Sequence, residues 1–305
     1  MLRVQNASIP GIIIPSAARR HCPKFRDVKG RRLDQRALAL GLVLAALLIV
    51  FAALGAALGD DPFASDFEHG IAAHTAPVGP GAQHWLGTDR LFRDVLSRAL
   101  VGLRYSLVIG IAATLITLLV GGAVGAIAGY FAGRRVPIDA VLMRIVDVGL
   151  ALPFLLLAMA IASAFDKPTA TTIFVTLGLT GWLGAARIVR ARVLEVRERD
   201  FVTASRALGA HDARLLAAHV IPNSLAPLFV MGSLSVGQMI LAESVMSYFG
   251  AGIAPPTPTL GRMLFEGQDS LQSAPWLFWV PAVLIVTCAL AFHLVGEGLR
   301  ARGTP

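Results

Sequence analysis

The sequence is poor in charged residues. Of its 305 residues only 15% are Asp, Glu, Lys or Arg, whereas 55% are hydrophobic. An average soluble domain carries about 25% charged residues, and it cannot bury an excess of apolar side chains as large as this one. The composition therefore excludes an ordinary soluble domain and predicts an integral membrane protein.

Lysine and cysteine are also scarce, and several enzyme motifs are absent. Lys24, Lys29 and Lys167 are the only lysines, and none precedes the Ser or Thr that a phosphate-binding P-loop requires. Cys22 lies in a basic stretch and Cys288 in an apolar run, which argues against a disulfide framework, a metal site or a redox pair. Neither HExxH nor GxSxG occurs. We therefore expect a chain that is not an enzyme, with no catalytic residue, cofactor or metal of its own.

The net charge of +8 does not indicate nucleic acid binding, because the basic residues lie in blocks beside apolar runs. Such blocks encode the orientation of membrane proteins, whose cytoplasmic loops are rich in Arg and Lys. They occur between Arg3 and Arg36, in the loop 190–224 and in the tail 300–305, whereas the loop 59–98 is richer in acidic residues. We therefore expect both termini and the loop 190–224 to be cytoplasmic, with no nucleic acid among the partners.

Long apolar runs predict six membrane spans, since about 20 apolar residues in a helix cross a bilayer. The first run lacks a small-residue cleavage site after it, so we expect it to be a retained span rather than a signal peptide. The sequence shows no obvious internal repeat, which argues weakly against secondary carriers built from repeated halves. The six predicted spans are Ala37–Leu58, Tyr105–Tyr130, Ile145–Phe165, Ala170–Val189, Leu225–Tyr248 and Trp276–Val295.

Four glycines follow one another at intervals of four residues in the second span. Gly121, Gly125, Gly129 and Gly133 share one helical face, and small residues at this spacing let a second helix approach closely. The pattern predicts a close helix contact, either inside this chain or with a partner subunit.

The loop 190–224 contains a predicted amphipathic helix, Phe201–Leu208. Phe201, Ala204, Ser205 and Leu208 recur at helical spacing and form one small, flat face. Gly209 is well placed to end this helix, because a left-handed C-terminal cap favours glycine.

A second helix is predicted directly after Gly209. Asp212 can cap a helix over Ala213–Val220, Pro222 is expected to stop it, and Asn223 can cap the fifth span. A small-residue face, a central glycine and a terminal proline together favour a docking element over an ordinary charged loop.

The residues of this loop also resemble a known signature. The stretch DFVTASRALGA, which begins at Asp200, and the later HVIPNSLAP resemble the ATPase-coupling signature of binding-protein-dependent ABC importers. The resemblance is greatest to the second, C-type permease subunit of the dipeptide/oligopeptide family. Ala204, Gly209 and Pro222 match that pattern, whereas Thr203 replaces its Glu and Ser205 its second Ala. The family's Glu often contacts the ATPase, and the resemblance does not extend to that contact.

Other segments resemble the same family, in the same order, between about His84 and Arg302. One departure is Phe92, which stands where the family has a glycine. The resembling segments are His84–Asp89, Arg93–Arg98, Leu152–Ala158, Glu243–Gly252, Pro255–Pro258, Ser273–Trp276 and Gly296–Arg300.

The resemblance implies an all-α permease subunit with the type I ABC importer fold in the bacterial inner membrane. The implied domains are a cytoplasmic segment 1–36, a first transmembrane helix 37–58, an extracytoplasmic loop 59–98, a transporter domain 99–299 and the tail 300–305. The implied partners are a second homologous permease, two ATP-binding cassette subunits that hold ATP and Mg, an extracytoplasmic substrate-binding protein and membrane lipid. The implied substrates are di- and oligopeptides, although relatives carry nickel, glutathione or haem.

Three ionisable residues within or near the spans are functional candidates, because a charge in lipid is costly. Glu243 can face the translocation pathway or reach the membrane interface, and Asp147 can pair with Arg144 three residues away. His293, close to the inner end of its span, is expected to be a packed interface residue rather than a proton relay. A proton-driven secondary carrier that uses Glu243 or Asp147 is the rival hypothesis. In the preferred hypothesis, an ABC importer, the two helices of the loop 190–224 move when the partner ATPases close on ATP, and this movement passes to spans three to five.

Overall fold

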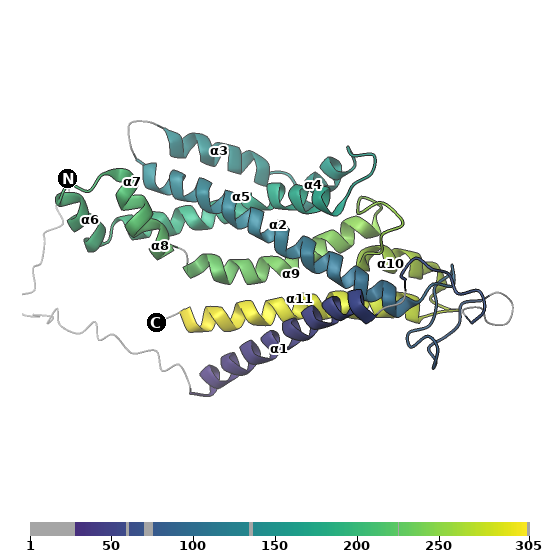
Figure 1. Ribbon diagram of the computed structural model, residues 1–305. Helices are drawn as coiled ribbons and strands as arrows, with labels where there is room; N and C mark the ends of the chain where they lie inside the picture. Colours follow the sequence, from purple (N-terminus) through teal and green to yellow (C-terminus); the bar gives the residue numbers. More distant parts are fainter. Residues whose placement is uncertain (1–27, 59–60, 70–75, 134–136, 225, 304–305) are drawn as a thin grey trace, which may run out of the picture.

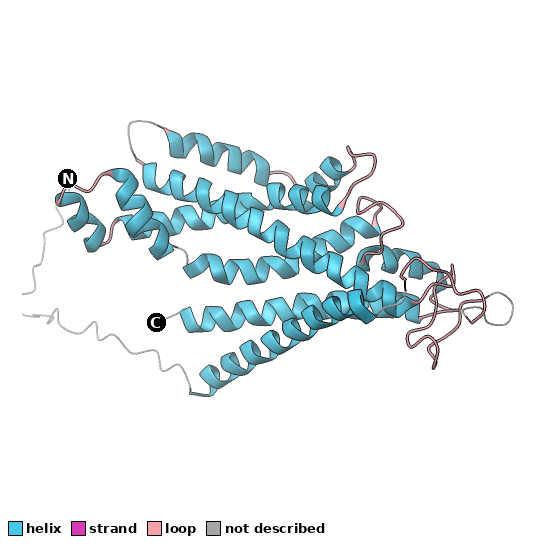
Figure 2. Cartoon of the chain, viewed as in Figure 1, coloured by secondary structure: helices cyan, strands magenta, loops and turns pink. Residues whose placement is uncertain are grey.

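The computed structural model describes residues 28–58, 61–69, 76–133, 137–224 and 226–303. Within these ranges the chain is helical and has no strand, apart from one isolated bridge between Thr88 and Asp94 (Figure 2). Cys22 and most of the N-terminal basic residues lie outside the described residues. The five long helices are α1 (Val28–Leu58), α2 (Val95–Phe131), α5 (Ala170–Arg197), α9 (Ala226–Tyr248) and α11 (Trp276–Gly303).

Each long helix contains an apolar stretch long enough to cross a membrane. They form an elongated bundle in which many large apolar side chains stay exposed, such as Phe51 of α1, Leu119 of α2 and Val286 of α11. A soluble protein does not leave so many such side chains in water. The exposure therefore agrees with a membrane protein.

The third predicted span, Ile145–Phe165, is wrong as a single helix. The structure has two helices there, α3 (Ile138–Leu150) and α4 (Phe154–Ala162), which are bent by 83° at a short break. The break contains Pro153, which disfavours the helical conformation for the residue before it. The predicted six spans are therefore reached if this bent pair is counted as one span.

Helix α2 is longer than the span Tyr105–Tyr130 predicted for it. It begins at Val95 because the side chain of Asp94 caps it, accepting a hydrogen bond of 2.7 Å from the backbone N–H of Ser97. Its 37 residues correspond to about 55 Å at 1.5 Å per residue, which is more than the hydrocarbon thickness of a bilayer. One end of α2 therefore extends beyond the apolar stretch.

The short helices gather at the two ends of the bundle. The start of α1, the end of α11 and the helices α6 to α8 lie at one end, which we call the α6–α8 end (Figure 1). The helix α10 (Leu260–Gly267), the turn η3 (Gln268–Ser270) and most loops lie at the other, the α10 end. The first and last described residues, Val28 and Gly303, thus lie on the same side as the loop 190–224. The assignment of that side to the cytoplasm and the division into domains stay predictions.

Candidate functional site

The first helix of the loop 190–224 is α6 (Asp200–Ala207), which begins one residue before the predicted Phe201 and has Leu208 as its C-cap. Val202 is fully buried in an apolar cluster with Val196 of α5. Phe201, whose ring lies 6.3 Å from that of His219, is 44% exposed, and Leu208 is 89% exposed. Because Val202 packs inward, the apolar face that contains Phe201 and Leu208 points away from the bundle.

Besides Phe201 and Leu208, this exposed side of α6 carries small side chains. Thr203, Ala204 and Leu208 are exposed, while Ser205 is half-buried and its Oγ lies 3.3 Å from Nε2 of His219. The hydroxyl of Thr203 donates a hydrogen bond of 3.4 Å to the carbonyl of Arg199, one turn earlier. Asp200 lies in the first turn, where a carboxylate is favourable near the helix N-terminus. We call Phe201, Thr203, Ala204 and Leu208 the outer face of α6.

Gly209 ends α6 as predicted. Its φ of +86° lies in the left-handed region, and the backbone N–H of Ala210 donates to the carbonyl of Ser205 at 3.2 Å. This arrangement satisfies a carbonyl that the helix leaves without a partner. A residue with a Cβ would be strained at this position, so the angle between α6 and the next helix depends on glycine.

The predicted cap of the second helix is wrong. Helix α7 (Asp212–Leu215) begins at Asp212, and His211 is its N-cap without a side-chain hydrogen bond. The carboxylate of Asp212 instead accepts a hydrogen bond of 2.6 Å from the hydroxyl of Tyr130, at the end of α2. A contact with a residue 82 positions away thus replaces the local capping contact.

The predicted stop at Pro222 is also wrong. The chain stays helical through a π-helical turn, η2 (Leu216–Val220), and then through α8 (Ile221–Ser224), which contains Pro222. In a π turn the backbone hydrogen bonds join residues five apart instead of four. This local change of register precedes Pro222, whose missing N–H would otherwise leave a gap in the α-helical hydrogen bonds. Asn223 does not cap α9, because its side-chain amide donates to the carbonyl of His219 at 2.6 Å.

Three of the four glycines of α2 pack against α5. A Cβ at Gly121, Gly125 or Gly129 would lie closer than 3.0 Å to atoms of α5, including backbone oxygens. The close contact is therefore inside this chain, the first of the two predicted alternatives. Gly133 is not part of it, because it follows the C-cap Ala132, has a φ of +76° and has no atom of the described residues within 4 Å of its Cβ position.

Glu243 is fully buried in α9. Its carboxylate accepts hydrogen bonds from the hydroxyls of Ser106 in α2, at 2.9 Å, and Ser247 in α9, at 2.7 Å. The side chain is therefore enclosed between α2 and α9, and its place in a pathway or at the membrane interface stays a prediction.

The other two ionisable candidates also differ from what the sequence predicts. Asp147 does not pair with Arg144, since its carboxylate binds Arg187 of α5 at 2.5 Å. His293 is exposed on α11 rather than packed. Within the described part of the chain no three His, Cys, Asp or Glu side chains form a group that could hold a metal ion.

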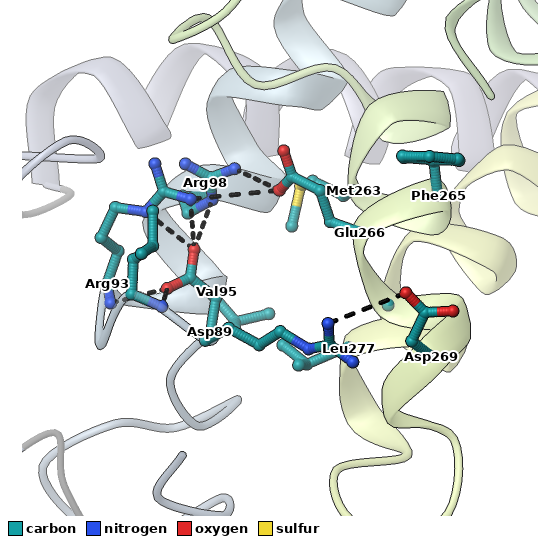
Figure 3. Close-up of a pocket in the computed structure, with 12 residues that line it drawn as sticks. Asp89, Arg93, Val95, Arg98, Met263, Phe265, Glu266, Asp269 and Leu277 are labelled. Carbon is teal, nitrogen blue, oxygen red and sulfur yellow. Dashed lines mark hydrogen bonds and ion pairs between the residues drawn. The ribbon is translucent and has the colours of Figure 1, made fainter. Parts of the chain in front are cut away.

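A charged network that was not predicted from the sequence lies at the α10 end. Arg98 is only 2% exposed, and its guanidinium binds Glu266 of α10 at 2.9 Å and Asp89 at 3.3 Å. Figure 3 shows the carboxylate of Asp89 between Arg93 and Arg98, beside a cavity of about 340 Å³. The alternation of Asp89, Arg93 and Arg98 before an apolar span was the available signal, but Glu266 lies 168 residues further on. The network fastens the loop before α2 to α10.

The backbone conformation at Phe92 explains why the resembling family segment has a glycine at this position. Its φ is +58°, in the left-handed region that bulky residues rarely adopt. Two backbone hydrogen bonds of 2.9 Å each, from the N–H of Phe92 to Asp89 and from the N–H of Asp66 to Phe92, hold the turn in this conformation. The strained residue is therefore part of the loop that carries the charged network.

Comparison with known proteins gives a family match over the C-terminal part of the chain. The family described as binding-protein-dependent transport system inner membrane component matches residues 121–302. The oligopeptide transport system permease protein OppC of Bacillus subtilis is 34% identical over 277 residues, which cover 90% of this chain and 88% of the relative. The di/tripeptide transport system permease protein DppC of Pseudomonas aeruginosa is 37% identical, with 96% of this chain and 94% of the relative covered.

The fold also has a counterpart among solved structures. The MetNI methionine ABC transporter in an inward-facing conformation contains a chain that matches with a TM-score of 0.52 at 19% identity. The match covers 66% of this chain and 94% of that chain. The likeness supports the same helical architecture.

Proposed function

Because the chain belongs to the family of binding-protein-dependent transport system inner membrane components, we propose that it forms half of the pathway of an ATP-driven peptide importer. It is a permease subunit of a bacterial ABC importer and a multi-pass protein of the inner membrane. The observation that carries the proposal is the outer face of α6, which is apolar, exposed and set at a fixed angle by Gly209. An apolar face of this kind suits contact with another protein.

Two ATP-binding cassette subunits are the proposed partners of this face. The sequence has no P-loop, so those subunits would bind ATP and Mg and would hydrolyse the ATP. A second homologous permease would complete the pathway, and a substrate-binding protein would deliver the substrate at the α10 end. Thr203 is exposed on the outer face, where a hydroxyl can donate or accept one hydrogen bond. It would make a weaker contact than the carboxylate that the related signature has.

The proposed mechanism is mechanical. Closure of the ATPase subunits on ATP would push α6 and α7, and the fully buried residues Val202, Leu215 and Val220 would pass that movement to the long helices. Closely packed interiors move as rigid bodies rather than deforming continuously. ATP would therefore shift the permease between outward-open and inward-open states through its different contacts with the two states.

The proposed substrates are di- and oligopeptides, because the relatives described above carry those names. Nickel, glutathione or haem is the alternative within the same family. Binding of peptides to the extracytoplasmic partner, measured by calorimetry, would separate these cargoes.

The proposal is tested with proteoliposomes that contain this chain, the second permease, both ATPases and the binding protein. Peptide uptake should require ATP, and uptake driven by a pH gradient without ATPases would contradict it.

Glu243 separates the importer from the rival proton-driven carrier. We expect Glu243→Gln to retain ATP-driven uptake to within about twofold, because serine hydroxyls can donate to the amide oxygen or accept from its nitrogen. Both hydrogen bonds, to Ser106 and Ser247, can then be kept. The measurement is the initial rate of peptide uptake in proteoliposomes. A proton carrier that used Glu243 would instead lose its activity.

A further inference from the structure

The end of α2 lies against the α6–α8 element and contains a buried tyrosine. Tyr130 is 1% exposed and belongs to the apolar cluster that also holds Val193, Val202, Leu215 and Val220. These four residues come from α5, α6, α7 and η2. The ring of Tyr130 is therefore part of the packing that joins α2 to the element.

The hydroxyl of Tyr130 adds a specific polar contact. It donates to Oδ1 of Asp212 at 2.6 Å, and Asp212 is the first residue of α7. A hydrogen bond to a carboxylate is shorter and stronger than one between neutral groups. Any displacement of α7 therefore pulls or pushes directly on the end of α2.

Arg197 holds the same end of α2 from a second side. Its Nη1 donates to the carbonyls of Ala132 at 2.7 Å, Gly129 at 3.1 Å and Tyr130 at 3.3 Å. The last carbonyls of a helix have no partner within it, and a cation is favourable there. Because Arg197 ends α5, the end of α2 cannot yield without moving α5 as well.

The other end of α2, near its first residue Val95, is also held by polar contacts. Ser106 binds Glu243 of α9, and Arg98 binds Glu266 of α10. Between the two ends, α2 is one continuous helix of 37 residues, packed on α5 through its glycines. A single stiff helix thus connects α7 at one end of the bundle with α10 at the other (Figure 1).

We propose that α2 is a transmission helix, and that the Tyr130–Asp212 hydrogen bond engages it with the movement of the α6–α8 element. The inference rests on the proposed function, because it assumes that partner ATPases move this element. It adds α2 to the spans three to five that the sequence predicts as receivers of the movement. Tyr130 is then a positioning residue, which contacts neither ATP nor substrate.

The test measures ATP hydrolysis and peptide uptake together in proteoliposomes that hold the complete transporter. In Tyr130→Phe we expect uptake per ATP hydrolysed to fall about tenfold, which is the effect of losing one hydrogen bond to a charged group on an equilibrium. ATP hydrolysis should stay near that of the wild type, because Tyr130 contacts no ATP, and the melting temperature should fall by a few degrees at most, since a single hydrogen bond is lost. Asp212→Asn should lower the same ratio, and the double variant should lose no more than Tyr130→Phe alone.

A matched control is Tyr248→Phe, which removes a hydroxyl that donates to Gln268 at the α10 end. It should leave the ratio of uptake to hydrolysis unchanged. A wild-type ratio in Tyr130→Phe would overturn the inference, as would full additivity of Tyr130→Phe and Asp212→Asn. A wild-type complex without ATP-driven uptake would instead overturn the proposed function, and the inference with it.

Discussion

Replacement of Gly209 by valine is expected to abolish most ATP-driven uptake. The residue has a φ of +86°, and a left-handed conformation costs a residue with a Cβ about 1–2 kcal/mol. That cost lowers the population of the observed angle between α6 and α7 by about 5- to 30-fold. Uptake per ATP hydrolysed in proteoliposomes should fall by a similar factor. Because no atom of the described residues lies within 4 Å of the Cβ position, the effect should come from the backbone and not from a clash.

Gly250 provides the matched control for this substitution. It has nearly the same φ, +83°, and an equally open Cβ position, but it follows α9 at the α10 end. Gly250→Val should therefore introduce the same local strain without changing the ratio of uptake to ATP hydrolysis. Equal losses of that ratio in both variants would mean that strain alone, and not the geometry of the α6–α8 element, explains the result.

The second large effect is expected from Gly125→Ala, which should destabilise the folded chain. The added Cβ would lie closer than 3.0 Å to the backbone oxygen of Ala186 and to Cβ of Val189. Backbone atoms cannot move aside as a flexible side chain can, so α2 and α5 must separate. Overpacking of this kind costs about 1–3 kcal/mol. The thermal unfolding midpoint in detergent should fall by several degrees.

Gly122 lies on the same helix and serves as the control for Gly125. A Cβ at Gly122 would have only Leu228 nearby, at 3.8 Å, which is an ordinary contact. Gly122→Ala should therefore keep the unfolding midpoint or raise it slightly, since alanine favours the helix by about 1 kcal/mol. An unchanged midpoint in Gly125→Ala would show that the two helices are not as close as the structure has them.

The long helices could be predicted from the sequence because a span needs only an apolar run of sufficient length. The same rule failed at α3 and α4, where a continuous apolar run hid the bend before Pro153. The rule also predicted too short a helix for α2, because the first turns of α2 carry Arg98 and are not apolar. Asp94 as an N-cap residue was the local signal for the true start.

The candidate site could be predicted only where its geometry is local. The spacing of Phe201 and Leu208 and the glycine at 209 are enough to predict α6 and its end. The role of Asp212 could not be predicted, because its partner Tyr130 is distant in sequence. The π turn before Pro222 also depends on packing, since Val220 is buried among residues of other helices.

In the proposed transporter the outer face of α6 contacts an ATPase subunit. The most direct test attaches a photoreactive probe to a single cysteine, in a chain whose Cys22 and Cys288 are replaced by serine. Leu208→Cys places the probe on the outer face, and Trp85→Cys, at a side chain that is 73% exposed, places it at the α10 end. Within the assembled transporter, we expect the probe at 208 to link to an ATPase subunit and the probe at 85 not to. An ATP-hydrolysing complex in which the probe at 208 links to no ATPase would contradict the claim.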